Sequence, residues 1–273
     1  MRTILRHLCM GALTASLCLG LSVEPALAQA PPVAQPSGPV AAALTDQESR
    51  DSALVDGSME AAGKGGIVAI AGDVPALEQV LARAPRDYGK SDVKDGVVRY
   101  RARDLADFLL FSAEFQAAAK AGKVVWVRDV YPIAGLLVGI YYNEVGQSER
   151  ALAALQTALA LEPDNSQLVT ETGMALARLG RGPEALPLYD KALALDGLTL
   201  PDLDRARVLR AKGFVLTDAG RLDEAEQAYK DSLKLQPDHA GAISELAYIA
   251  HLRAGGAPGK PRMTTTEKAR TGQ

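Results

Sequence analysis

Apolar residues recur at helical spacing through most of the second half of the chain, whereas strand-like alternation is confined to short segments. Helical periodicity runs from residue 132 to residue 253. Between 67 and 131 the pattern is mixed, because 97–101 and 124–127 are strand-like while 105–121 has helical spacing. The sequence predicts a mainly α chain in which a small α+β or helical module, 67–131, precedes a helical domain, 132–253.

The segments around this module are less regular. The run 67–71 fits either a buried strand or a helix end. After it, Asp73 is expected to cap a short helix that continues to Pro85. Residues 29–66 are rich in proline, glycine and polar side chains, which predicts a flexible linker with at most a short helix at 59–62. Residues 254–273 show no apolar periodicity and are predicted to be a disordered tail.

A repeat appears within the helical domain. The same small, aromatic and helix-ending residues return in three copies, and the first two copies are 34 residues apart. Glycines are expected where two helices approach closely and again seven residues later, where a helix ends in a left-handed cap. The matching positions are Gly139, Gly173 and Gly213; Gly146, Gly180 and Gly220; Ala151, Ala185 and Ala225; Leu155, Tyr189 and Tyr229; and Pro163, Gly197 and Pro237.

This pattern resembles the tetratricopeptide repeat (TPR) over about 120 of 273 residues. The resemblance implies a right-handed α-solenoid of three helix pairs followed by a capping helix. Leu155, Tyr189 and Tyr229 are expected to fill the space between repeats. Two departures stand out, because Gly197 replaces the closing proline of the second repeat and six extra residues precede the third. We expect a wider turn there and a longer next helix.

The last helix should cover the end of the solenoid. Asp238 is expected to cap it at the N-terminus. Its inward and outward positions are predicted from the helical period: Ile243, Leu246, Ala247 and Ala250 inward, and Glu245, His251 and Arg253 toward water.

The N-terminus has the features of an export signal. Arg2 and Arg6 precede an uncharged run of fourteen residues, 8–21, and a small-x-small motif ends at Ala28. The run is shorter than the roughly 20 apolar residues of a spanning helix. We therefore predict a signal peptide, 1–28, and an exported protein, with the periplasm as its compartment. An uncleaved membrane anchor and lipidation at Cys18 are the alternatives.

Composition narrows the function further. The formal charge of −3 gives no basic surface for nucleic acid. Both cysteines, Cys9 and Cys18, lie in the predicted signal, so the mature chain has no disulfide, thiolate metal site or catalytic cysteine.

No residue pattern indicates catalysis. His239 and His251 do not have the spacing of a helical zinc pair, and Ser148 is expected to cap its helix rather than to act as a nucleophile. The glycines of 63–66 lack the spacing of a phosphate-binding loop. We predict no enzyme, no cofactor and no metal.

What remains is binding along the first helices, which the TPR resemblance places on a concave groove. The predicted groove runs from apolar to basic and suits a peptide or partner helix with an acidic side chain or terminal carboxylate. Its residues are Ile133, Leu136, Ile140, Asn143, Gln167, Thr170, Met174, Arg178, Arg207, Arg210, Phe214, Thr217 and Tyr248. Leu136 and Ile140 replace two members of the carboxylate clamp of chaperone-binding TPR proteins, which argues against that activity.

The sequence thus predicts a non-enzymatic adaptor or scaffold of the bacterial cell envelope. Two alternatives stay open: an enzyme or ligand-binding protein whose activity lies in 67–131, and a structural protein that self-associates through its repeat ends.

Overall fold

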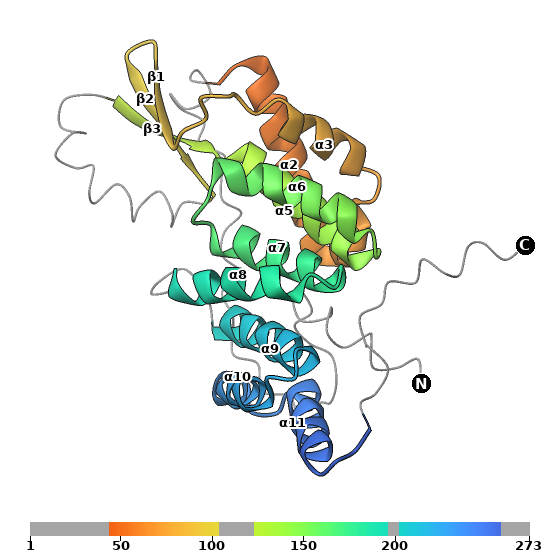
Figure 1. The fold of residues 1–273 in the computed structure, drawn as a ribbon. Coiled ribbons are helices and arrows are strands. Elements are labelled where there is room, and N and C mark those ends of the chain that lie inside the picture. The colour runs from red at the N-terminus through yellow and green to blue at the C-terminus, as the bar shows by residue number, and fades with distance from the viewer. Residues whose placement is uncertain (1–43, 104–122, 196–201, 258–273) are drawn as a thin grey trace, which may run out of the picture.

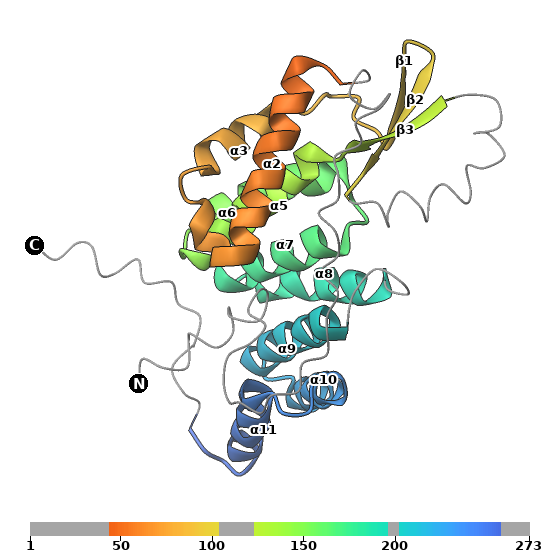
Figure 2. The same cartoon turned by 180° about the vertical axis from the view of Figure 1, so that it is seen from behind.

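Helices stacked in layers make up most of the molecule. The computed structural model describes residues 44–103, 123–195 and 202–257. From α2 and α3 at one end to α11 at the other, successive layers lie one below the next, and a three-stranded sheet projects beside the first layer (Figure 1). Seen from behind, α2 crosses α5, which it contacts (Figure 2). The predicted signal peptide and nearly all of the predicted tail lie outside the described residues.

Helix α2, Asp46–Gly65, corrects the prediction of a flexible linker up to residue 66. A capping box starts it, since Thr45 Oγ1 accepts from the Glu48 amide at 3.1 Å and Glu48 Oε2 accepts from the Thr45 amide at 2.7 Å. Its buried stripe is Asp51, Val55, Ser58 and Ala62. Only two of these are apolar, so the helix has little of the hydrophobic periodicity on which the sequence prediction relied.

The next two elements are short. The run Ile67–Ile70 is a 3₁₀ helix, η1, and so neither a strand nor the end of a helix. Helix α3, Val74–Ala82, follows as predicted, with Leu77, Val80 and Leu81 buried. Asp73 precedes α3 but does not cap it with its side chain; its carboxylate instead accepts from the Ser58 hydroxyl at 2.9 Å, which ties α3 to α2.

The sheet has the order β1-β2-β3. Strand β1, Ser91–Lys94, which the sequence analysis missed, pairs antiparallel with β2, Val97–Ala102. The turn between them is Asp95-Gly96, and both residues have positive φ angles, 52° and 75°. Such turns match the twist of paired strands and favour the Asp-Gly dipeptide.

Strand β3, Lys123–Arg128, pairs parallel with β2 in the register Val97↔Lys123. Parallel neighbours need a crossover connection, which here must come from residues 103–122. The helix predicted over 105–121 lies outside the described residues. The two predicted strands are confirmed.

Three helix pairs and a last helix follow. The first pair is α5, Val130–Glu144, and α6, Ser148–Leu161; the second is α7, Ser166–Arg178, and α8, Gly182–Ala194; the third is α9, Asp202–Asp218, and α10, Leu222–Leu235. Helix α9 has 17 residues against 13 in α7, which confirms the longer helix expected after the insertion. Pro163 and Pro237 follow the ends of α6 and α10 as predicted.

Close packing inside each pair explains the recurring glycines. A Cβ on Gly173 would lie 2.7 Å from Tyr189 Cε1, and one on Gly213 would lie 3.0 Å from Tyr229 Cε2. Gly139 meets Leu155 in the same way. These large side chains therefore pack against the first helix of their own pair, and Tyr229 also clusters with Ile249 of the last helix, as expected for a side chain between successive helix layers.

One hydrophobic core runs across the expected boundary at residue 131. It joins α2, η1 and α3 to the helices from α5 to α9, and includes Val55, Leu77 and Val138. A second cluster holds α9, α10 and α11 together through Leu216, Tyr229 and Ile249. The first two helices thus extend the stack, and the sheet is inserted between α3 and α5.

Helix α11, Ala240–Arg253, ends the stack in a different rotation from the predicted one. Its buried residues are Ala242, Glu245 and Ile249, whereas Ile243, Ala247 and Ala250 are exposed. His239, and not Asp238, caps it: Nδ1 of His239 accepts from the Ala242 amide at 3.1 Å. The predicted inward positions Ile243, Ala247 and Ala250 and the outward Glu245 are thus wrong, whereas Leu246 packs on the second cluster and His251 and Arg253 are exposed, as predicted.

Candidate functional site

The residues of the predicted groove lie on α5, α7, α9 and α11, which we call the A-helix face. These first helices of successive pairs contact one another along the stack. Only Gln167 is exposed. Leu136, Ile140, Met174, Arg178, Arg207 and Tyr248 are half-buried, and Ile133, Asn143, Thr170, Arg210, Phe214 and Thr217 are buried.

Several of the buried side chains are occupied by packing or by their own helix. Phe214 and Ile133 belong to the main core. The hydroxyls of Thr170 and Thr217 donate to the carbonyls of Ser166 and Gly213, one turn earlier, at 2.7 and 2.9 Å. These four residues shape the face but offer a partner little to bind.

A polar network at the centre of the face links three helices. Glu171 of α7, 3% exposed, accepts from the Arg207 guanidinium of α9 through Oε1. Its Oε2 accepts from Asn143 Nδ2 of α5 at 3.3 Å. Arg178 Nη1 donates to the Asn143 carbonyl at 2.8 Å. The network therefore joins three predicted groove residues around one buried carboxylate.

Arg210 lies three residues beyond Arg207 on α9 and is 8% exposed. Its Nη1 donates to Gln236 Oε1 at 3.0 Å, and no carboxylate pairs with it among the described residues. Burial, and then the positive charge of Arg207, lower the pKa of Arg210 to about 10. Proteins normally pair a buried charge, so this guanidinium stands out as a group that a ligand anion would satisfy.

Glu171 and Gln236 were not among the predicted site residues. Glu171 is the acid in the otherwise uncharged stretch 166–177, four residues after Gln167 and three before Met174. That spacing places it on the same helix face as these two residues. Gln236 follows α10 at its C-terminal end, and sequence spacing relates it to no position on α9.

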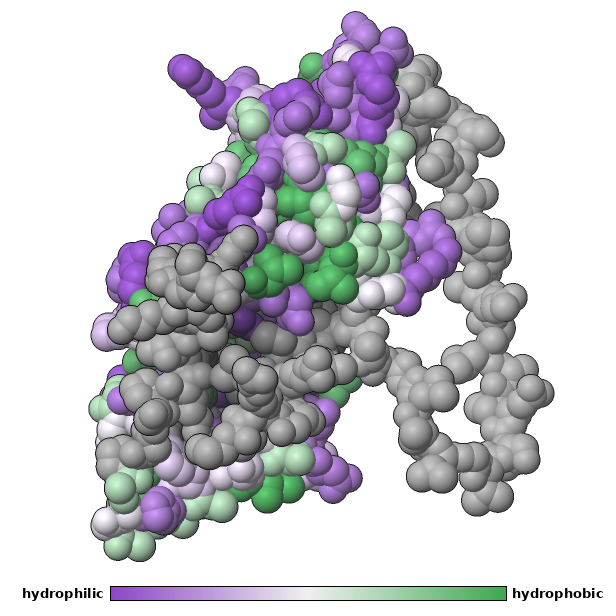
Figure 3. Space-filling view, turned by 90° about the vertical axis from the view of Figure 1, so that its right-hand side faces the viewer, coloured by the Kyte–Doolittle hydropathy of each residue, from purple (hydrophilic) through white to green (hydrophobic). Residues whose placement is uncertain are grey.

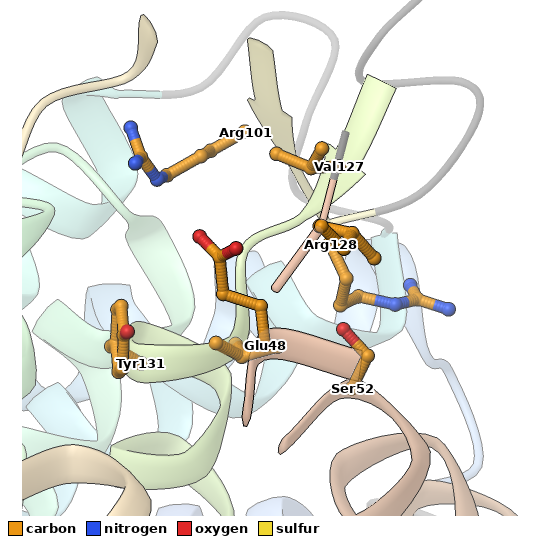
Figure 4. Close-up of a pocket in the computed structure, with 8 residues that line it drawn as sticks. Glu48, Ser52, Arg101, Val127, Arg128 and Tyr131 are labelled. Atoms are coloured by element: carbon orange, nitrogen blue, oxygen red, sulfur yellow. The ribbon is translucent and has the colours of Figure 1, made fainter. Parts of the chain in front are cut away.

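A second candidate site is a small pocket between α2, the sheet and α5. Figure 4 shows side chains that line it: Glu48 and Ser52 of α2, Arg101 of β2, Arg128 of β3 and Tyr131 of α5. Its cavity volume is only about 20 Å³, which is far below the range for drug-sized ligand sites.

The charged groups of this pocket already have protein partners. Glu48 pairs with Arg99 at 2.9 Å, and Arg128 pairs with Asp56 at 2.7 Å. Arg101 pairs with Asp92 and also donates to the Gly89 carbonyl at 2.7 Å. The hydroxyls of Ser52 and Tyr131 are the polar groups that remain to meet a small ligand.

A buried cluster fixes the sheet insertion to the first helix pair. The Lys90 ammonium lies 3.1 Å from Oδ2 of Asp129, just before α5, and also contacts Glu162 at the end of α6. Asp129 is fully buried, and its Oδ1 has no hydrogen-bond partner among the described residues. Burial raises the pKa of Asp129 to about 7, despite the nearby ammonium. This cluster supports the fold and lies apart from the A-helix face.

Ser148 does not have the expected capping role. Helix α6 begins at Ser148 itself, and its N-cap, Gln147, makes no capping hydrogen bond through its side chain. The Ser148 hydroxyl is buried without a partner among the described residues. A buried hydroxyl with no base beside it is no activated nucleophile.

Apolar surface also lies outside the A-helix face. Figure 3 shows apolar side chains gathered in the upper half of the face that is on the right in Figure 1. Large apolar residues are exposed on several elements, among them Val68 of η1, Val145 after α5, and Ile243 of α11. The helices that the structure describes contain no segment with the length and apolar character of a membrane span. Among the described residues of the chain, no group of three or more His, Cys, Asp or Glu side chains is placed so that it could hold a metal ion.

The comparisons with known proteins agree with this fold. Residues 168–238, from α7 to just beyond α10, match the family model for the tetratricopeptide repeat. The TPR repeat-containing thioredoxin TTL4 of Arabidopsis thaliana is 34% identical over 99 residues, which are 36% of this chain and 14% of that protein. The chain thus matches a small part of that relative.

Solved structures are similar in fold at low identity. The MamA RS-1 ArsTM double mutant is 14% identical with a TM-score of 0.50, covering 77% of this chain and 86% of that one. The first TPR of Spaghetti (RPAP3), bound to the HSP90 peptide SRMEEVD, is 23% identical with a TM-score of 0.41, covering 45% and 93% of the two chains. The matched residues 168–238, from α7 to just beyond α10, thus form tetratricopeptide repeats, and the pair α5 and α6 packs on them with the same kind of glycine contact.

Proposed function

We propose that the protein is a non-enzymatic adaptor that binds a carboxylate-bearing segment of another protein on its A-helix face. The anchor is Arg210, and two half-buried residues of the same face, Met174 of α7 and Tyr248 of α11, would supply apolar contact. Binding of this kind requires no catalytic residue and changes no covalent bond. It agrees with the protein-interaction role in which TPR domains are used.

Arg210 carries the proposal. A guanidinium that is 8% exposed and paired only with a neutral amide among the described residues has lost most of its hydration without gaining a counter-charge. An incoming carboxylate would supply that charge and could bind in a bidentate way. Because the site is mostly desolvated, the ion pair would gain more than one at the surface.

Peptides with defined C-termini test the anchor. A library of random dodecapeptides is screened against the full chain, once with free C-termini and once with amidated C-termini. We expect a set of free-carboxylate peptides to bind at least tenfold more tightly than their amidated forms, and Arg210→Gln to abolish this difference.

The control is Arg221→Gln, which removes the same charge from an exposed arginine that precedes α10 and pairs with Glu224 at 2.6 Å. Phe214 is not replaced in this experiment, because it is buried in the core and its substitution would affect folding. The role of Arg210 as the anchor is refuted if amidation changes the affinity of no peptide. It is also refuted if Arg210→Gln and Arg221→Gln have the same effect on the difference between free and amidated peptides.

We further propose that this adaptor works in the cell envelope of a bacterium, after export. The support is the N-terminal sequence, with two arginines, an uncharged run and a small-x-small motif ending at Ala28. Sequencing the N-terminus of the protein recovered from an expressing bacterium should give Gln29 as the first residue. An intact N-terminus in a cytosolic fraction would contradict export.

The pocket of Figure 4 supports a second candidate, a ligand site beside the sheet. It would take a hydroxyl or amide group of a small neutral molecule, since among the described residues that line it only Ser52 and Tyr131 are available and the charges are paired. Replacing Ser52 with Leu should fill this pocket. A fragment screen in which a bound compound loses affinity in Ser52→Leu, but not in Arg210→Gln, would favour this function.

Self-association is a third candidate, supported by the exposed Ile243, Ala247 and Ala250 on the last helix. A molar mass that rises with concentration, and that Ile243→Glu reduces to the monomer, would favour it. A constant monomeric mass would exclude it.

A further inference from the structure

The A-helix face already holds one carboxylate of its own. Glu171 accepts from Arg207 through one oxygen and from Asn143 through the other. The acid is 3% exposed, and its partner Arg207 has a side chain that is 20% exposed. Arg207 is therefore a partly exposed cation of the face whose charge is opposed by a carboxylate of the protein itself.

Arg207 and Arg210 occupy the same side of α9, three residues apart, but differ in what opposes their charge. Arg207 faces the buried carboxylate of Glu171, while Arg210 faces the neutral amide of Gln236. A ligand carboxylate that approaches Arg210 meets an unopposed positive charge. One that approaches Arg207 must compete with Glu171 and lies close to a like charge.

We propose that Glu171 is the specificity-determining residue of this face: by occupying Arg207, it limits the partner segment to a single carboxylate, bound at Arg210. A segment that brings a second acid next to the first would place it near Arg207 and gain nothing there. This inference rests on the proposed function, because it assumes that Arg210 binds the partner's carboxylate.

The test compares peptide pairs that differ in one residue. From the free-carboxylate binders of the library, matched peptides are made with either Gln or Glu at the penultimate position. Binding of both forms is measured with the wild-type chain, Glu171→Gln and the double variant Glu171→Gln/Arg207→Gln. Glu184→Gln is the control, since Glu184 is an exposed acid paired with Arg181 at 2.6 Å on α8.

For the wild-type chain, the Glu form should bind no more tightly than the Gln form. In Glu171→Gln the Glu form should gain about tenfold over the Gln form, as a charge-assisted bidentate pair with Arg207 becomes available. The gain should vanish in the double variant, and Glu184→Gln should behave like the wild type.

Each other result is decisive. A Glu-to-Gln affinity ratio that is the same in wild type and Glu171→Gln overturns the role of Glu171 while leaving Arg210 as the anchor. If Glu171→Gln does not fold, the double variant Glu171→Gln/Arg207→Gln, which keeps the net charge, still tests the proposal. A Glu-to-Gln affinity ratio that is lower in this variant than in the wild type would mean that Arg207 already binds the second acid in the wild type, which overturns the role of Glu171. Wild-type binding that ignores the terminal carboxylate overturns both proposals.

Discussion

Replacing Arg210 with methionine should stabilise the unliganded protein while removing its binding of carboxylates. Arg210 is 8% exposed, and no carboxylate among the described residues opposes its charge. Methionine has a similar length, no charge and enough flexibility to fill the space. A residue kept for binding at a cost in stability is expected at a functional site.

The size of the effect follows from the pKa of Arg210, which burial and Arg207 lower from 12.5 to about 10. That difference, at about 1.36 kcal/mol per pKa unit, corresponds to about 3 kcal/mol of unfavourable free energy for holding the charge in the folded state. Because the folded pKa lies below the unfolded one, this cost is fully present at neutral pH and disappears only as the pH rises through 10 toward 12.5.

Losing the hydrogen bond to Gln236 offsets part of the gain, by about 1 kcal/mol. We therefore expect a net stabilisation of about 2 kcal/mol, or a rise in Tm of about 4–8 °C for a domain of this size.

Urea and thermal unfolding at pH 7, followed by circular dichroism, measure this change. Urea is the better denaturant here because it adds no salt to screen the charges. Arg221→Met is the control, as its guanidinium is exposed and paired with Glu224, and its stability should stay close to that of the wild type. If Arg210→Met is less stable than the wild type, Arg210 is a structural residue, and the reasoning that leads from its burial to a binding role is refuted.

Three further predictions address the fold. Because burial raises the pKa of Asp129 to about 7, the folded state holds a proton that the unfolded state has lost; stability should therefore rise as the pH falls from 8 to 5, and Asp129→Asn should remove this trend in urea titrations. Gly173→Ala should lower stability by about 1–3 kcal/mol, because the new Cβ lies 2.7 Å from Tyr189; Gly57→Ala in α2 meets nothing within 4 Å and should be neutral or stabilising. Thr45→Ala should lower the free energy of unfolding by about 1 kcal/mol in urea titrations, because it removes the capping box of α2. If the substitution lowers the helical signal of the isolated 44–66 peptide but leaves the stability of the whole protein unchanged, the capping box does not stabilise the folded protein.

The repeats could be predicted because their signals are local and recur. Gly173 and Tyr189 are 16 residues apart, so one contact fixes a helix pair, and the same contact returns at Gly213 and Tyr229. Helix α2 and strand β1 were missed for the opposite reason. Asp51 and Ser58 are buried because Arg83 and Asp73 bind them, and these partners are distant in sequence. The capping box at Thr45 and the Asp95-Gly96 turn were nonetheless readable signals.

The candidate site was predictable in position but not in electrostatics. Helical spacing was sufficient to place Arg207 and Arg210 on one face. It could not show that Glu171 opposes the first arginine and Gln236 the second, since these contacts span 36 and 26 residues. Nor could it separate Phe214, which packs in the core, from the half-buried Met174 one repeat earlier.

The division of the core into two clusters has a consequence for the dynamics of the stack. The smaller cluster, which includes Leu216, Tyr229 and Ile249, holds α10 and α11 to α9. A unit with so few buried side chains should open more often than the rest, and amide hydrogens of α10 and α11 should exchange with solvent before those of α7. Gln236 belongs to this unit and Arg210 belongs to α9, so each opening would separate the two. The last helices would then regulate how often the guanidinium meets solvent, and hence how fast a partner can bind to it.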